Sequence, residues 1–462
     1  MAGASVCVIG GGVAGIAATK ALLDRGVAVE AFERSDRLGG VWSYGNPSGV
    51  SAAYDTLHLN SSRAMTQWPD HPMPDDWPHY PSHIQVKAYL DDYAERFGVT
   101  DATTFETAVE RVERRAEGGW DVTLSDGRTR SYDKVIAANG HHAEPKVPEF
   151  PGHFDGVVMH SHDYENREQL RDQDVVVLGL GNSAMDVVAQ AAQVGRSATL
   201  AARRGYHVLP KFLFGIPLDQ WPNDPRVPFA VRRRALALLI RVGHGTMADY
   251  GLPEPDHALG SSHPTVSHDV FAPLRRGDIT VKPNIARFDG DEVEFVDGSR
   301  VRADVVVLAT GYRIVFPFLD PEVLSAPDNE IALYGNLFDP RYDDLAVCGL
   351  VQTIGSNIRM AHAQAQLLGD WAAGTYALPD ADAMREDIDA NVAAMRQRYV
   401  ASTRHTVQVD HHDYLRWIDR ERRDGALRAG QDPPADLPEP GPVRALVDEV
   451  AARLPRIGRG AA

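Results

Sequence analysis

The sequence predicts an α/β protein built from two parallel-sheet units and a helical C-terminal extension. Two segments, one at the N-terminus and one near the middle, run from an apolar strand through a glycine-rich turn into a helix. Short apolar strands return after each segment, as expected where strands and helices alternate in a parallel sheet. The length of 462 residues also exceeds what a single hydrophobic core usually holds.

The composition is that of an ordinary globular protein, with 44% hydrophobic and 24% charged residues. The formal net charge of −17 argues against a nucleic-acid partner, which would require a basic face. No run approaches the roughly 18 apolar residues needed to span a membrane, and the N-terminus does not read as a secretory signal. We therefore expect a cytoplasmic protein that binds neither nucleic acid nor membrane.

The first glycine-rich segment, residues 6–15, reads VCVIGGGVAG. Gly10 permits a tight turn, Gly12 allows the backbone to approach a pyrophosphate closely, and Gly15 allows the helix to pack closely on the strand. The helix that opens at Val13 and Ala14 points its N-terminal amides at the anion. Glu33 follows 23 residues after Gly10, where a carboxylate accepts hydrogen bonds from a ribose diol. A Rossmann-like dinucleotide site is therefore predicted.

The second segment, residues 175–184, reads VVVLGLGNSA and repeats the pattern. The corresponding positions are Gly179, Gly181 and Ala184. Here Arg203 and Arg204 begin 24 residues after the first glycine. A guanidinium at this place would bind a 2′-phosphate and favour NADPH over NADH, and either arginine could supply it. Two nucleotides of different kinds on one chain imply electron transfer between them.

The first unit is expected to begin with residues 1–165. Its predicted helices cover residues 13–25 and 82–97, and its predicted strands cover residues 6–9, 27–32, 104–111, 119–124 and 132–138. The segment 37–81 is too long for an ordinary connection. Because it carries several aromatic residues, we expect an ordered loop that faces substrate or cofactor.

The second unit is expected at residues 166–305, inserted into the first, which resumes at 306–375. The remaining predicted strands cover residues 279–281, 292–296, 305–308 and 347–349, and the remaining helices cover 228–242 and 357–373. A Pro-rich stretch, 206–264, carries aromatic residues that could line an apolar substrate site or pack a lid: Phe212, Phe214, Trp221 and Phe229. Residues 376–462 are expected to form the helical extension.

Neither the cysteines nor the histidines predict a site of their own. Cys7 and Cys348 lie 341 positions apart in apolar runs, which argues against a redox-active pair and so against a two-nucleotide disulfide reductase. His141–His142 and His411–His412 are adjacent pairs whose side chains diverge, and neither has the spacing of a ligand set. No metal is expected.

The segment between the two glycine motifs carries a further pattern, Phe-x-Gly-x-x-x-His-x-x-x-Tyr. Its fixed positions are Phe154, Gly156, His160 and Tyr164. This resembles the identifying motif of class B flavin-dependent monooxygenases. Further segments match the same family in order over residues 1 to about 370: residues 38–42, 54–62, 70–74, 181–184 and 309–312.

The resemblance implies FAD at the first glycine motif and NADPH at the second. It also implies that NADPH reduces FAD, and that a flavin 4a-hydroperoxide passes one oxygen atom of O2 to a small-molecule substrate. Asn60 resembles the family's catalytic asparagine beside the flavin, whose amide can hydrogen-bond the oxygen species or the nicotinamide. Trp42 is expected to pack near the flavin and Gln352 to approach its ring. The other cofactor contacts that the resemblance implies are Gly40, Val41, His58, Ser61, Val109, Asn182, Ser183, Thr310 and Gly311.

Within the family, the pattern is closest to the N- and S-oxygenating flavin-containing monooxygenases. Baeyer–Villiger enzymes of the commonest type extend the motif as Thr-x-x-Trp, whereas residues 161–164 read Ser-His-Asp-Tyr. Oxygen transfer to an amine or sulfide is therefore expected, with Baeyer–Villiger oxidation of a ketone as the alternative and a non-catalytic nucleotide-binding protein as a more distant one. His160 and Tyr164 are expected to position the linker and NADP⁺, and a homodimer is possible.

Overall fold

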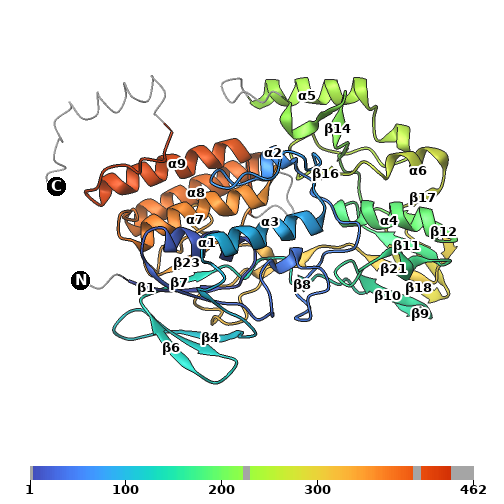
Figure 1. Ribbon diagram of the computed structural model, residues 1–462. Helices are drawn as coiled ribbons and strands as arrows, with labels where there is room; N and C mark the ends of the chain where they lie inside the picture. Colours follow the sequence, from blue (N-terminus) through green and yellow to red (C-terminus); the bar gives the residue numbers. More distant parts are fainter. Residues whose placement is uncertain (1–3, 222–228, 399–406, 439–462) are drawn as a thin grey trace, which may run out of the picture.

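The computed structural model describes residues 4–221, 229–398 and 407–438. Two five-stranded sheets lie side by side along the molecule (Figure 1), in the strand orders β23-β7-β1-β2-β3 and β10-β21-β11-β12-β17. All strand pairings within both sheets are parallel. The predicted α/β class with two Rossmann-like units is confirmed.

The first sheet is assembled from distant parts of the chain. Its strands are β1 (Ser5–Ile9), β2 (Ala28–Phe32), β3 (Thr103–Thr104), β7 (Lys134–Ala137) and β23 (Leu345–Val347). Helix α1 (Val13–Leu23) connects β1 to β2, as the glycine motif predicts. Because β23 follows the whole second sheet in sequence, the first unit is discontinuous, as expected.

One predicted strand of this unit is wrong, because the structure divides it between two sheets. The strand expected at 104–111 is divided between β3 and β4 (Val109–Arg114), which belong to different sheets. Glu106 between them has the left-handed φ of 52°, which an extended strand cannot contain. The strand expected at 132–138 is confirmed as β7; only Tyr132 belongs to β6 (Thr129–Tyr132), and the Asp133 amide between them donates to the carbonyl of Ser5 at 3.0 Å.

Alternation along β1 sorts its side chains to two different cores, as the period of a strand requires. Val6 and Val8 face the helices, whereas Cys7 and Ile9 face an antiparallel meander of β4, β5 (Trp120–Leu124) and β6. Both faces of the first sheet are therefore covered, which is why this strand reads as an unbroken apolar run.

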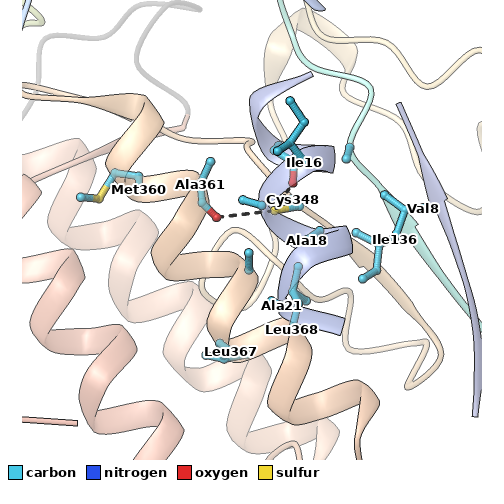
Figure 2. Close-up of a cluster of buried hydrophobic side chains, with 14 of the residues drawn as sticks. Val8, Ile16, Ala18, Ala21, Ile136, Cys348, Met360, Ala361, Leu367 and Leu368 are labelled. Carbon is cyan, nitrogen blue, oxygen red and sulfur yellow. Dashed lines mark hydrogen bonds between the residues drawn. The ribbon is translucent and has the colours of Figure 1, made fainter. Parts of the chain in front are cut away.

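The face of the first sheet that points away from this meander is covered by α1, α3 (His83–Arg96) and α7 (Asn357–Ala372). Figure 2 shows Cys348 between α1 and α7, where its thiol contacts the carbonyls of Ala14 at 3.7 Å and Ala361 at 3.9 Å. Both cysteines are buried free thiols. Burial raises the pKa of Cys348 to about 12, so its thiol stays neutral and Cys348 packs as an ordinary core residue.

The C-terminal helices α8 (Ala381–Arg398) and α9 (His411–Arg428) continue the core of the first unit. Asp370 of α7 receives hydrogen bonds from Arg422 of α9 at 2.6 Å and from Arg25 at 2.8 Å. The described part of the predicted extension is thus joined to the first sheet through buried ionic contacts, while residues 439–462 lie outside the described residues.

The second unit is larger than expected at both ends. Its strands are β10 (Val157–His160), β11 (Asp174–Leu178), β12 (Ser197–Ala201), β17 (Ile279–Lys282) and β21 (Val305–Leu308). The expected boundaries at 165/166 and 305/306 are therefore wrong, because β10 and β21 pair with each other inside this sheet. Helix α4 (Asn182–Val194) follows β11.

The remaining elements are short and lie around this unit. A four-stranded sheet contains β9 (Gly152–Phe154), β18 (Ile285–Gly290), β19 (Glu292–Phe295) and β20 (Arg300–Arg302). Residues 206–276 add β13 (Val208–Leu209), β14 (Phe212–Leu213), β15 (Ile216–Pro217), α5 (Phe229–Gly243), β16 (Thr265–Val266) and α6 (Phe271–Arg276). Strand β8 (Glu144–Pro145) pairs with β22 (Tyr312–Arg313) where the chain crosses between units. Two further short pieces are α2 (Arg63–Thr66) and the pair β24 (Gln352–Thr353) and β25 (Gln408–Val409). Within the described ranges, every helix falls short of the length and apolarity required to cross a membrane.

Candidate cofactor and active site

The first glycine turn has the shape that a dinucleotide needs. Gly10 has a φ of 108°, and a Cβ on Gly15 would lie 1.7 Å from the Gly10 carbonyl oxygen, so neither position tolerates a side chain. A Cβ on Gly12 would meet only the Cα of Gly40, at 3.7 Å. The backbone at Gly12 is therefore accessible to a pyrophosphate, whereas a Cβ on Gly40 would lie 3.0 Å from the Gly12 Cα.

Glu33 closes this turn from the end of β2. Its carboxylate is buried, with Oε2 accepting from the Gly11 amide at 2.6 Å and Oε1 from the Ser35 amide at 2.8 Å. Each oxygen keeps a further lone pair. The carboxylate is thus fixed at the place where a ribose diol would donate to it, and the first site fits FAD.

The second glycine turn repeats this geometry at the start of α4. Gly179 has a φ of 134°, a Cβ there would lie 2.5 Å from the Ala309 oxygen, and Ala184 is fully buried. Asn182, expected to contact the cofactor, uses its Oδ1 to accept from the Val266 amide at 2.9 Å. Its side chain therefore holds β16 over the turn, and Ser183 beside it remains half-exposed.

Arg203 and Arg204 follow β12 and line a shallow cavity of about 390 Å³. Lys282, which the sequence reading missed, lines the same cavity from the end of β17. The two strands adjoin, and the Ala202 amide donates to the Lys282 carbonyl at 2.9 Å. Arg203 and Arg204 form a basic site that suits a 2′-phosphate, and Lys282 lies at its edge, with Nζ donating to Ser299 Oγ at 3.0 Å. The signal for Lys282 was its place at the end of a predicted strand, but only the strand order brings it to the arginines.

Asn60 has a buried side-chain oxygen, Oδ1, that has no hydrogen-bond partner. An unpartnered buried amide oxygen costs free energy unless a ligand satisfies it, so it fits the expected role beside a bound cofactor. Ser61 and His58, which are also expected to contact the cofactor, have hydrogen bonds within the protein. Ser61 shares a hydrogen bond of 2.8 Å with Thr66, and the exposed His58 contacts the Thr56 carbonyl through Nδ1 at 2.7 Å.

The linker motif has a structural task at each fixed position. Phe154 packs on Phe288, and a Cβ on Gly156 would lie 2.4 Å from the Asp304 oxygen. His160 is buried, which lowers its pKa, and its ring meets that of Tyr312 edge-on.

Tyr164, the last position of the motif, is fully buried and donates to Gln190 Oε1 at 2.7 Å. Gln190 in turn donates to Thr56 Oγ1 at 2.6 Å. One turn earlier on α4, Asp186 accepts a hydrogen bond from Tyr54. Burial raises the pKa of Asp186. Helix α4 therefore holds the segment that leads to Asn60, through two residues that sequence reasoning missed.

The other predicted positions lie on surrounding elements. Thr310 donates to the Lys146 carbonyl at 2.5 Å, and the Gly311 carbonyl accepts from the Lys146 amide, so this pair joins the crossing strands. Val41 and Trp42 belong to a short 3₁₀ helix with Gly40 and are half-buried. Val109 begins β4 and Gln352 begins β24, both half-buried.

Some aromatic residues of 206–221 are packed against other parts of the chain, whereas Phe214 is exposed. Phe212 meets Tyr80 edge-on, with ring centres 5.2 Å apart, whereas Phe214 is 61% exposed at the tip of the β14–β15 hairpin. Trp221 donates to the Leu213 carbonyl at 3.3 Å. The side chain of Phe229 lies outside the described residues. Among the residues that the structure describes, no three His, Cys, Asp or Glu side chains form a group that could hold a metal.

A family model described as flavin-binding monooxygenase-like matches residues 3–421 of the chain. Flavin-containing monooxygenase 5 of Oryctolagus cuniculus is 32% identical over 447 residues, which cover 89% of this chain and 81% of that protein. Flavin-containing monooxygenase 3 of Rattus norvegicus is 31% identical over 436 residues, with coverages of 89% and 81%.

Solved structures share the fold. S-allyl-L-cysteine S-oxygenase from Allium sativum aligns with a TM-score of 0.68 at 24% identity, covering 97% of this chain and 92% of that one. Open cyclohexanone monooxygenase aligns with a TM-score of 0.69 at 17% identity, with coverages of 92% and 98%. The chain belongs to the flavin-binding monooxygenase-like family, and it is an oxidoreductase that uses FAD and NADPH to insert one atom of O2 into a small-molecule substrate.

Proposed function

We propose that the oxygen acceptor is a soft nucleophile, the nitrogen of an amine or the sulfur of a sulfide. The observation that carries this proposal is the end of the linker motif, where Tyr164 stands in place of tryptophan and is buried against Gln190. The relatives at 31–32% identity carry the name flavin-containing monooxygenase, which is consistent with it.

Baeyer–Villiger oxidation of a ketone is the second candidate. The fold is as similar to that of cyclohexanone monooxygenase as to that of the S-oxygenase, with TM-scores of 0.69 and 0.68. The departure from the Thr-x-x-Trp ending argues against it. The test is the product mass with ¹⁸O2 and NADPH, using a panel of amines, sulfides and ketones. Label in an N-oxide or sulfoxide supports the proposal, and label in an ester or lactone with no labelled N-oxide or sulfoxide overturns it.

The residues have separate roles in this proposal. Glu33 and the first glycine turn bind FAD, while Arg203, Arg204 and Lys282 bind the 2′-phosphate of NADPH. Bound FAD supplies the redox chemistry and the oxygen transfer. The unpartnered Oδ1 of Asn60 supports a place for its amide beside the cofactors, and segments 54–62 and 206–221 exclude water from that region.

We also place the enzyme in the cytoplasm, since both cysteines are buried free thiols of the kind found in a reducing compartment. A homodimer is the assembly proposed, and the molar mass from light scattering of the holoenzyme tests it. A mass near the 50.5 kDa of one chain would contradict it.

A further inference from the structure

The backbone on either side of Asn60 is hydrogen-bonded to Lys211 and Asp219, the two residues that flank the hairpin of β14 and β15. On one side, Nζ of Lys211 donates to the carbonyl of Leu59 at 3.0 Å. On the other side, Oδ2 of Asp219 accepts from the amide of Ser62 at 2.6 Å. Asn60 lies between these two backbone groups, one residue after the first and two before the second.

The hairpin presents Lys211 and Asp219 together because of how its base closes. The amide of Leu218 donates to the Lys211 carbonyl at 2.9 Å, and the Tyr80 hydroxyl donates to that same carbonyl at 2.5 Å. The Lys211 ammonium also lies 5.1 Å from the centre of the Tyr80 ring. Lys211 is thus fixed at its backbone and at its side chain.

Burial makes both ionic groups costly unless they are bound. It lowers the pKa of Lys211 and raises the pKa of Asp219, since a charge removed from water is disfavoured. Each group directs its hydrogen bond to the backbone of the 59–62 segment. Oδ1 of Asp219 is buried without a partner. Both buried side chains therefore join the hairpin to residues 59–62.

We infer that Lys211 and Asp219 are positioning residues that fix the carboxamide of Asn60 at the cofactor site. The inference rests on the proposed role of Asn60. With Tyr54 and Thr56 already bound to helix α4, the segment 54–62 of the first unit is held at four points by residues 186–219. The position of Asn60 is therefore set by the part of the chain that binds NADPH.

The first test measures the backbone directly, by hydrogen–deuterium exchange of peptides covering residues 57–66 in the FAD-loaded enzyme. Asp219→Ala should raise the exchange rate of the Ser62 amide about tenfold, the effect of losing one charge-assisted bond. Lys211→Met should raise exchange across the same peptide, and Lys211→Arg should restore protection because it keeps a donor. Lys146→Met, an exposed lysine, is the matched control. Unchanged exchange in both Asp219→Ala and Lys211→Met overturns the clamp.

The second test separates positioning from folding. With NADPH and O2 but no substrate, Lys211→Met and Asp219→Ala should release H2O2 about tenfold faster, since a 1 Å misplacement can cost up to about a hundredfold. Anaerobic flavin reduction by NADPH and the FAD content should stay close to those of the parent enzyme. Asp219→Asn keeps the side-chain volume and an acceptor for the Ser62 amide, so it should release H2O2 at a rate close to that of the parent enzyme.

A double-mutant comparison assigns the effect to Asn60. If the clamp acts through Asn60, adding Lys211→Met to Asn60→Ala should not raise H2O2 release further, because residues that act as a unit are not additive. A multiplied effect overturns the inference. If Asn60→Ala alone leaves H2O2 release unchanged, the proposed role of Asn60 fails, and the exchange experiment still decides whether the clamp exists.

Discussion

The hydroxyl of Tyr164 donates to Oε1 of Gln190 at 2.7 Å, at a site where both residues are buried. The tyrosine ends the linker motif and the glutamine lies on α4, whose first turn is the proposed NADPH site. Because Gln190 also binds Thr56 at 2.6 Å, one side chain joins the linker, the NADPH-side helix and the segment before Asn60.

Tyr164→Phe should therefore destabilise the protein by about 1–3 kcal/mol, since it leaves the buried Gln190 oxygen without its donor. Urea unfolding of the holoenzyme measures this change. Tyr44→Phe, at a side chain that is 37% exposed, is the control and should cost much less. Equal losses in the two variants would show that the Tyr164–Gln190 bond contributes nothing particular.

Replacing Lys282 with Ala should raise the KM for NADPH about 10- to 100-fold and leave the KM for NADH almost unchanged, because only NADPH carries the 2′-phosphate. Arg203→Ala and Arg204→Ala should act in the same direction, and the larger of their effects identifies the closer guanidinium. Steady-state kinetics with both nucleotides measures the ratio. A parallel rise for NADH would remove Lys282 from the phosphate site.

Gly15→Ala should abolish FAD retention, because the new Cβ would lie 1.7 Å from the Gly10 oxygen and would force α1 away from β1. Gly26→Ala is the matched control: its φ is 66° and its Cβ would meet nothing within 4 Å. That substitution should cost only about 1 kcal/mol for the left-handed backbone and leave the protein yellow. The ratio of flavin absorbance to protein absorbance after gel filtration distinguishes the two.

The local motifs could be predicted from sequence because their physics is local. Glycines at 10, 12 and 15 act within one turn, and Glu33 is placed by one strand. Lys282, Gln190 and Lys211 could not be found this way, since their partners come from strand order and from the packing of one unit on the other. The split strand at 104–111 was missed for a related reason. Its apolar alternation continues through Glu106, and only the tertiary contacts select the left-handed turn there.

The free energy of unfolding should fall in acid, because three histidines are partly or fully shielded from water in the folded protein. Nε2 of His141 is buried without a hydrogen-bond partner, and burial lowers the pKa of His141 to about 4. Burial also lowers the pKa values of His244 and His411 to about 4. Between about pH 6.5 and pH 4 the unfolded chain binds protons that the folded chain does not, so stability falls as the pH drops through this range.

His141→Gln should reduce this fall by about 1–2 kcal/mol between pH 7 and pH 5, because glutamine does not titrate and removes one proton from the difference. Urea unfolding at the two pH values measures the change. His153→Gln, at a side chain that is 82% exposed, should leave the difference between pH 7 and pH 5 as it is. If His141→Gln lowers the free energy of unfolding equally at both pH values, His141 stabilises the protein by packing, and its protonation does not account for the loss of stability in acid.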